Sequence, residues 1–188
     1  MRESVIPLPV AVFTDLLHRH QWPLYGFVRH LLLDDEQARD VVQETFCKAW
    51  KAFQRAAPPF ADGHDAEHQR RWLFHVAYCE AISVLRRRKR LRWESLEDTA
   101  GEHDALAGAF ENQIAENDAL RAALAKLSRE DSAAVLLNVV HGFPAPEIAD
   151  MLDISLQATK KRLTRAKQRL RAAYFAQEED HERRANPL

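Results

Sequence analysis

The sequence contains few glycines and few cysteines. Its 188 residues include 5 glycines and 2 cysteines. So few glycines leave little material for tight β turns and exclude a glycine-rich phosphate-binding loop. Cys47 and Cys79 form neither a disulfide framework nor a zinc-ligand spacing, and this fits a reducing cytoplasm. We therefore expect an almost wholly helical, intracellular protein.

The sequence also lacks a long apolar run and a signal peptide. No apolar stretch approaches the roughly 18 residues of a membrane-spanning helix, and the N-terminal segment MRESVIPLPV has no long apolar core. Nor can paired carboxylates, a nucleophile elbow or a phosphate loop be placed, so nothing supports an enzyme or a cofactor. The 46% hydrophobic content is still enough to bury one core or two small ones. We expect a soluble protein without membrane insertion.

The charges are segregated along the chain. The net charge is −1, so no overall excess of positive charge argues for nucleic acid. Residues 86–92, the first basic segment, contain six Lys or Arg, and residues 160–171, the second basic segment, contain seven and no acid. Between them, residues 94–118 contain eight acids and no Lys or Arg. This pattern predicts two basic surfaces joined by an acidic linker.

The first basic segment ends a predicted helix over residues 70–92, which contains no Gly or Pro. Apolar residues fill one broad arc of this helix, and the opposite side is its predicted outer face. An aromatic ring, small polar groups and a basic end suit a polyanion whose bases can stack. A core helix with a solvated cationic end is the alternative. The outer face of the 70–92 helix comprises Trp72, His75, Cys79, Ser83, Arg86 and Arg87.

Two helices are expected before this one. The first begins near Pro9 and is interrupted or kinked at Trp22-Pro23. The second covers residues 35–53, with Asp34 as N-cap and Gln37 at the capping-box position. Its acidic first half faces outward, which either complements the helix dipole or docks a basic partner, and the residues alone favour solvent. The outward side chains are Asp40, Gln43, Glu44, Cys47, Lys48 and Lys51.

Residues 56–68 read as a loop because of their Pro-Pro and Asp-Gly pairs. His64, Asp65 and His68 in this loop could ligate a metal ion, as could His75 and Cys79 one helical turn apart. Loop histidines at such spacing are usually solvated, and two ligands without a third make a poor site. We therefore expect no metal.

A second unit begins at Ala119. Ser128 caps a predicted helix that runs to His141 with Val140 inward, and Gly142 occupies the C′ position. Pro146 lies in the first turn of the next helix, and Ser155 caps a final helix from Leu156 to about Tyr174. Two helices joined by a three-residue turn, the second rich in Lys and Arg, predict a DNA-binding helix-turn-helix. Its outward side chains include Lys160, Lys161, Thr164 and Arg165. A plain basic helical hairpin is the alternative.

Three stretches resemble a known family. DDEQARDVVQETFCKAWKAF and RRWLFHVAYCEAISVLRRRKR resemble region 2 of the sigma-70 family, and GFPAPEIADMLDISLQATKKRLTRAKQRLRAAY resembles its region 4. The resemblance covers roughly residues 12–92 and 119–174. With no region 3 domain between them, the chain is most similar to the extracytoplasmic-function (ECF, group 4) sigma factors. The resemblance implies an all-α protein of two small helical domains, with region 2 over residues 1–92, an acidic linker over 93–118, a region 4 helix-turn-helix over 119–176 and a charged tail over 177–188.

The resemblance also implies partners and site residues. Core RNA polymerase would be bound through its β′ clamp coiled-coil and β flap. The outer face of the 70–92 helix would hold the non-template strand of the −10 promoter element. The acidic linker would occupy the polymerase channel near the RNA exit path, and control by an anti-sigma factor is common in the family. Docking on the clamp falls to Asp40, Gln43, Glu44 and Lys48. Reading of the −35 element falls to Gln157, Lys160, Lys161, Thr164 and Arg165.

Several positions depart from the family pattern. Many members have Asn where Cys79 stands and Asp or Asn where Ser83 stands, so the base captured at the −10 element is left open. Asp153 replaces the usual Gly of the helix-turn-helix turn, but Asp tolerates the left-handed conformation better than most residues. Ala158-Thr159 replaces the usual Thr-Val. Lys161 replaces the common Ser and favours a phosphate contact.

A DNA-binding regulator that works without polymerase is the competing function. That reading explains the helix-turn-helix equally well. It leaves the acidic outward face of residues 35–53 and the aromatic, basic outer face of the 70–92 helix without a role. We therefore favour the promoter-specificity subunit, which has no catalysis of its own.

Overall fold

The computed structural model describes residues 8–55, 60, 66–94 and 123–185. Over these residues helices are the only regular secondary structure, which confirms the all-α prediction. The chain divides into two compact units, Met1–Glu102 (unit 1) and His103–Leu188 (unit 2). Most of the predicted acidic linker, and the loop residues His64 and Asp65, lie outside the described residues. Within them, no helix is long and apolar enough to cross a membrane.

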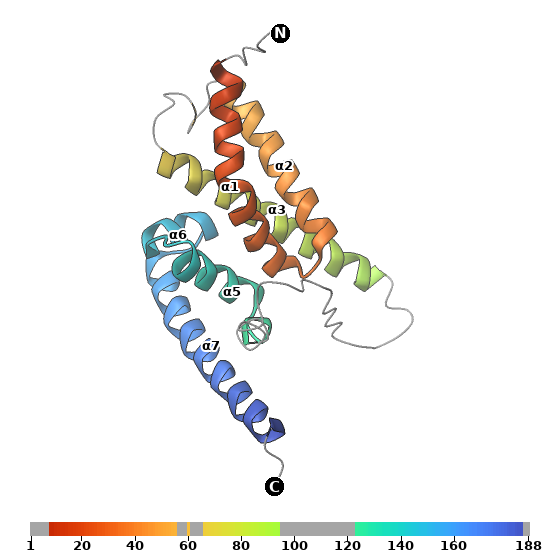
Figure 1. Ribbon diagram of the computed structural model, residues 1–188, viewed down its shortest axis with the longest axis vertical. Helices are drawn as coiled ribbons and strands as arrows, with labels where there is room; N and C mark the ends of the chain where they lie inside the picture. The colour runs from red at the N-terminus through yellow and green to blue at the C-terminus, as the bar shows by residue number, and fades with distance from the viewer. Residues whose placement is uncertain (1–7, 56–59, 61–65, 95–122, 186–188) are drawn as a thin grey trace. The chain divides into compact units, whose positions relative to one another are not determined.

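Unit 1 is built from three helices, each of which packs against the other two (Figure 1). They are α1 (Leu8–Leu32), α2 (Asp35–Gln54) and α3 (Ala66–Glu94). Phe27 of α1 and Phe74 of α3 are almost fully buried, and their ring centroids lie 5.5 Å apart. Burial of such rings is the main stabilising contribution to this core.

A second group of rings joins the other end of unit 1. Phe13 of α1 lies edge-on to Trp50 of α2, with ring centroids 4.8 Å apart. Phe53 stacks on Trp50 and also meets Phe60, which comes from the segment between α2 and α3 and is 4% exposed. Phe60 in turn lies edge-on to Trp72 of α3 at 5.4 Å. One series of rings thus connects all three helices.

The predicted interruption at Trp22-Pro23 is wrong if it is taken as a helix end, because α1 continues through Pro23 to Leu32. Proline removes one backbone hydrogen bond from a helix interior. Leu16 before it and Leu24 after it are both buried in the same core. Packing on both sides of Pro23 therefore holds the helix together across the missing bond.

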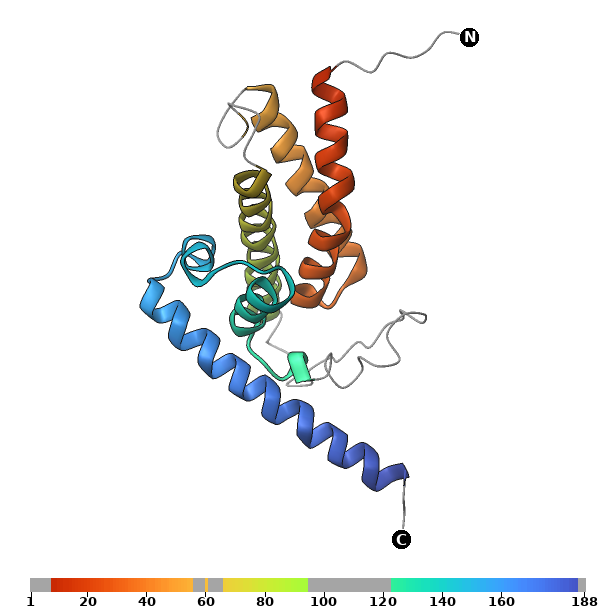
Figure 2. The same cartoon turned by 60° about the vertical axis from the view of Figure 1, so that its left-hand side comes forward.

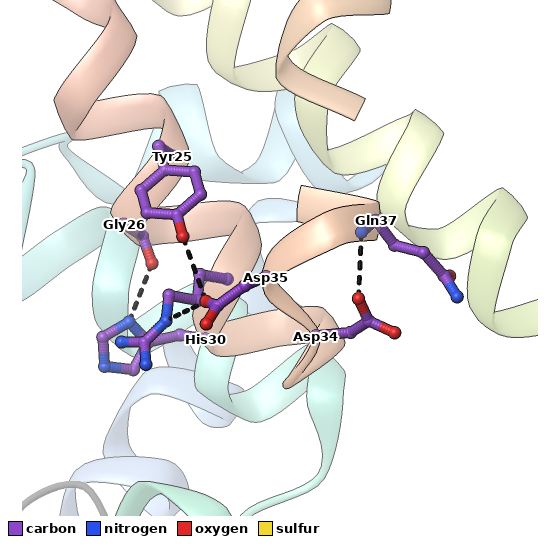
Figure 3. Close-up of polar contacts among 7 residues, drawn as sticks. Tyr25, Gly26, His30, Asp34, Asp35 and Gln37 are labelled. Carbon is purple, nitrogen blue, oxygen red and sulfur yellow. Dashed lines mark hydrogen bonds and ion pairs between the residues drawn. The ribbon is translucent and has the colours of Figure 1, made fainter. Parts of the chain in front are cut away.

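The turn between α1 and α2 is closed by side chains (Figure 3). Asp34 caps α2 as predicted, since its Oδ1 accepts a hydrogen bond from the backbone N–H of Gln37 at 2.9 Å. Leu33, just before it, has φ +53°, and its N–H bonds to the carbonyl of Arg29. Asp35 accepts at Oδ1 from the Tyr25 hydroxyl at 3.0 Å and from Arg29 Nε at 2.5 Å. The end of α1 is thereby fixed to the start of α2.

Unit 2 consists of shorter helices followed by one long helix (Figure 2). Its described elements are α5 (Arg129–Val135), a π-helical turn η1 (Leu136–Val140), α6 (Ala145–Leu152) and α7 (Leu156–Ala185). The caps are as predicted: Ser128 Oγ accepts from the N–H of Asp131, and Ser155 Oγ accepts from that of Ala158. The buried side chains include Leu127, Ala134, Leu137, Phe143, Ile148, Met151, Leu163 and Ala166.

Two details of unit 2 differ from the sequence-based prediction. Val140 is not inward but 64% exposed, because the helix widens into a π turn in which the His141 N–H bonds back to Leu136. The extra residue per turn rotates Val139 and Val140 toward solvent. The last helix continues to Ala185 rather than stopping near Tyr174. Nothing between these positions breaks a helix, and the first proline is Pro187.

The helix-turn-helix forms as predicted. Asp153 ends α6 in the left-handed conformation, with φ 52° and ψ 50°. The N–H of Ile154 then bonds to the carbonyl of Ala149 at 3.1 Å, which closes the end of α6. Gly142, at the end of η1, has φ +72°, as its predicted C′ position requires. A short polar side chain at Asp153 therefore performs the role usually given to glycine.

Candidate nucleic-acid interfaces

The six residues predicted to face outward from the 70–92 helix lie along one side of α3, and we call this side the α3 outer face. They fall within an arc of about 120° on the helix. Cys79, Ser83, Arg86 and Arg87 are exposed, whereas Trp72 and His75 are half-buried. The Trp72 ring is held at one edge by the buried ring of Phe60. The face therefore combines a fixed aromatic ring with exposed polar and basic side chains.

His75 and Cys79 adjoin each other on this face. Cys79 Sγ lies 3.8 Å from His75 Nε2, as expected for residues one helical turn apart. Across the described part of the chain, no group of three or more His, Cys, Asp or Glu side chains is arranged to hold a metal ion. The pair belongs to the surface of α3 and is not part of such a cluster.

The first basic segment is not uniformly outward. Arg86, Arg87, Lys89 and Arg90 are exposed. Arg88 instead turns to the α1–α2 junction, where its Nη2 lies 2.6 Å from Asp34 Oδ2 and its Nη1 donates to the Leu32 carbonyl at 3.1 Å. Because its partners are more than 50 residues away in sequence, no local pattern distinguishes Arg88 from its neighbours. Exposed Arg90 shares the α3 outer face, and the sequence-based prediction omitted it.

The acidic outward face of α2 is open at three of its four predicted docking positions. Asp40, Gln43 and Glu44 are exposed. Lys48, at the edge of this face, bonds to Glu80 of α3 and lies 3.9 Å from Glu44. The hydrogen bond from Lys48 to Glu80 raises the pKa of the lysine, although its partial burial opposes the shift. Lys48 therefore connects α2 to α3 as well as bordering the open face.

The α7 outer face comprises the predicted −35 residues Gln157, Lys160, Lys161, Thr164 and Arg165, and all five are exposed. They lie within an arc of about 140°. The buried stripe of α7, formed by Thr159, Leu163 and Ala166, lies on the opposite side of the helix. A helix held by its apolar stripe and presenting a basic outer face has the geometry with which helix-turn-helix proteins enter a major groove.

The remaining bases of α7 near its packed side are tied to α5 and η1. Arg162 Nε lies 3.6 Å and Arg169 Nη1 lies 3.1 Å from the carboxylate of Asp131. On the other flank, Lys167 Nζ donates to Asn138 Oδ1 at 2.7 Å, while Asn138 donates to the Phe143 carbonyl. Three of the seven bases in the second basic segment thus bond to side chains of α5 and η1. Sequence reasoning missed Asp131 and Asn138 because their partners are 29 to 38 positions away.

Comparison with known proteins matches both units to one family. The family model for sigma-70 region 2 matches residues 16–91, and the model for sigma-70 region 4 matches residues 117–170. The chain is 30% identical over 161 residues to the ECF RNA polymerase sigma factor SigL of Mycobacterium tuberculosis, an alignment that covers 86% of this chain and 88% of SigL. The chain belongs to the ECF sigma factors. Unit 1 carries region 2, and unit 2 carries region 4.

Further relatives and solved structures are similar to this ECF sigma factor over most of its length. SigE of Mycolicibacterium smegmatis is 29% identical over 169 residues, and the alignment covers 84% of this chain but 59% of SigE. Among solved structures, RpoE of Bartonella quintana, in complex with the anti-sigma factor NepR, has a TM-score of 0.65 at 26% identity. That match covers 86% of this chain and 95% of RpoE. CnrH, solved with the cytosolic domain of CnrY, has a TM-score of 0.57 at 25% identity. It covers 87% of this chain and 88% of CnrH.

Proposed function

We propose that this ECF sigma factor binds core RNA polymerase, recognises the −10 and −35 promoter elements and promotes DNA opening for initiation, with no catalysis of its own. One observation carries the proposal: the units that match regions 2 and 4 each present an exposed basic face on a helix fixed by its packed side. Residues 1–92 would perform the functions of region 2, and residues 119–176 would perform those of region 4. Residues 93–118 join the two. We place this activity in the cytoplasm, where a bacterial cell keeps its polymerase and chromosome.

Region 2 would bind the −10 element through the α3 outer face. The half-buried Trp72 and His75 offer ring surfaces for an unstacked base, and Arg86 and Arg87 offer positive charge to the backbone. A surface that binds a single strand but not the duplex shifts the equilibrium toward open DNA. Cys79 and Ser83 stand exposed on this face, so the base it captures is read by a thiol and a hydroxyl rather than by amides.

Region 4 would read the −35 element through the α7 outer face. Lys160, Lys161 and Arg165 supply exposed positive charges close to the first turns of α7. Thr164 donates its hydroxyl hydrogen to the Lys160 carbonyl at 3.0 Å, which leaves the hydroxyl oxygen as an acceptor and the methyl group for apolar contact. Phosphate contacts of the lysines would set the register of the helix, and base-edge and shape contacts would set its specificity.

Core docking would use the open acidic face of α2. Changing Asp40→Arg together with Glu44→Arg should lower the affinity for core polymerase at least about tenfold, because it reverses two charges facing a basic partner surface. Fluorescence titration of core with labelled sigma factor measures the change. The matched control is Asp15→Arg on α1, whose carboxylate is also exposed, and we expect it to bind core normally.

Binding to core polymerase and the location of the docking face are tested by separate outcomes. If the unaltered chain forms no stable complex with core polymerase, the sigma-factor function is overturned and a polymerase-independent regulator takes its place. If the chain binds core but the double variant binds equally well, docking lies on another surface. Circular dichroism must show that the double variant keeps its helices, since both positions are exposed and neither contributes to the core.

An anti-sigma factor belongs among the proposed partners. RpoE, whose match covers 86% of this chain, was solved with the anti-sigma factor NepR. CnrH, similar over 87%, was solved with the cytosolic domain of CnrY. Two structural relatives bound to protein partners support a regulatory partner of the same general kind here.

A further inference from the structure

We propose that Asp131 determines the DNA specificity of region 4 by holding Arg162 and Arg169 against α5 and away from the phosphate backbone. This inference rests on the proposed reading of DNA by α7. Asp131 is not on the α7 outer face and needs no contact with DNA. It acts by limiting which cations of the second basic segment are presented.

The geometry places one nearly buried carboxylate between two arginines. Asp131 has a side-chain exposure of 14%, against 30% for Arg162 and 65% for Arg169. The two arginines are seven residues apart, which is about two turns of helix, so both project toward the same side of α7. Asp131 is itself fixed, because its N–H bonds to the capping Ser128. The neighbouring Ser132 hydroxyl bonds to the Leu124 carbonyl.

A base on the other flank of α7 is also bonded within the unit. Lys167 projects to the other side of the buried stripe and donates to Asn138 at 2.7 Å. The bases that border the packed side therefore have partners within the unit on both flanks. The exposed cations near the start of α7 are left on the outer face: Lys160, Lys161 and Arg165.

This arrangement matters because phosphate contacts raise affinity for every DNA sequence equally. Each additional phosphate neutralised strengthens non-specific binding and steepens its dependence on salt. Specificity is the ratio of specific to non-specific affinity, so cations that reach only phosphates reduce it. Asp131 cancels one positive charge of the arginine pair and directs both guanidinium groups toward α5. The carboxylate thereby keeps non-specific affinity low, so that the residues that contact bases determine a larger share of the binding.

The test is Asp131→Asn in the full-length chain, bound to a 20-base-pair duplex of random sequence over a range of salt concentrations. Release of one or two arginines to phosphates should steepen the slope of log affinity against log salt by about 1 to 2. The control is Glu130→Gln, which removes the same charge from the adjacent, exposed position of α5. We expect this control to leave the slope near that of the unaltered chain. Equal slopes for the two variants would overturn the inference.

A second variant covers the case in which Asp131→Asn loses its helical circular dichroism. Arg169→Gln removes a guanidinium that is withheld from DNA in the unaltered chain, so its slope should not change. Lys160→Ala removes a presented cation and should make the slope shallower by about 1. If Arg169→Gln has the same effect as Lys160→Ala, Asp131 withholds nothing. If Lys160→Ala has no effect, the proposed α7 face is wrong, whatever the Asp131 variants show.

Discussion

Unit 1 and unit 2 each hold a basic helix in place, but through different types of side-chain contact. The core of unit 1 is rich in large rings, with Phe27 against Phe74 and a series of rings from Phe13 to Trp72. Among its described residues, unit 2 buries one aromatic ring, Phe143, among Ala, Leu, Ile, Val and Met side chains. Unit 2 compensates with charged and polar bonds that run from α7 to α5 and η1.

Both units also use part of their basic segment for internal contacts. Arg88 closes the α1–α2 junction in unit 1. Arg162, Lys167 and Arg169 hold α7 in unit 2. The number of Lys and Arg in a segment therefore overstates the positive charge that the segment presents to DNA. The difference between presented and internal bases is visible only from the packing.

The largest expected effect comes from the rings of unit 1. Phe27→Ala should lower the free energy of unfolding of unit 1 by about 4 kcal/mol, because it removes a buried ring and leaves a cavity. Hydrogen exchange should show faster exchange of the amides of α1, α2 and α3 and unchanged exchange in α5 to α7. Trp22→Ala, at a ring that is 71% exposed, is the control and should cost less than about 1 kcal/mol. Equal loss of protection in both units would contradict their separation.

A smaller effect is expected at the α1–α2 junction. Asp35→Asn should cost about 2 kcal/mol near neutral pH, because the charged acceptor of the Tyr25 and Arg29 bonds is lost. Burial alone would raise the pKa of Asp35, but hydrogen bonds from Arg29 and Tyr25 outweigh it and hold the pKa below its ordinary 3.8. A lowered pKa in the folded state means that this stabilisation is present above pH 3.8 and disappears as the pH falls through the folded value.

Urea unfolding at several pH values measures the pH dependence. The difference in unfolding free energy between the unaltered chain and Asp35→Asn should shrink as the solution is acidified from about pH 7 to about pH 3. Asp15→Asn, at an exposed acid of α1, should show little difference at any pH. A gap for Asp35→Asn that stays constant with pH would mean that the ionised carboxylate is not its source.

The smallest expected effect on stability comes from Arg88, and it distinguishes bases bonded within the unit from bases exposed to DNA. Arg88→Ala should lower the unfolding free energy of unit 1 by about 1 kcal/mol, since its bonds to Asp34 and Leu32 are partly exposed. Arg87→Ala should leave stability unchanged and weaken binding to a single-stranded DNA probe. Urea unfolding and fluorescence anisotropy measure the two quantities on both variants. An Arg88→Ala variant that keeps full stability but loses DNA affinity would place Arg88 among the presented bases.

Much of the fold could be predicted because it depends on local signals. The caps at Asp34, Ser128 and Ser155, the glycine at 142 and the left-handed Asp153 are each set by a few neighbouring residues. The continuation of α1 through Pro23 and the exposure of Val140 could not be predicted in this way. Both depend on packing between helices and on one extra residue in a turn, which periodicity does not encode.

The candidate interfaces also combine features set by local sequence with features set by tertiary packing. Most predicted outward positions on α2, α3 and α7 are exposed, as helical periodicity predicts, but Trp72, His75 and Lys48 are half-buried. The roles of those residues in binding polymerase and DNA stay predictions. The internal roles of Arg88, Lys48, Asp131 and Asn138 have no local signal, because each depends on a partner about 30 or more positions away. Tertiary contacts decide which charges a surface can present.

Run-off transcription distinguishes a promoter-specificity subunit from a regulator that works without polymerase. Purified chain is mixed with core RNA polymerase and a set of genomic fragments, and the 5′ ends of the transcripts are mapped. The proposed function predicts transcripts with defined start sites that share two upstream sequence blocks, one for each unit. These transcripts should be lost when either block is scrambled. Transcripts with start sites independent of sequence, or none beyond those of core alone, would contradict it.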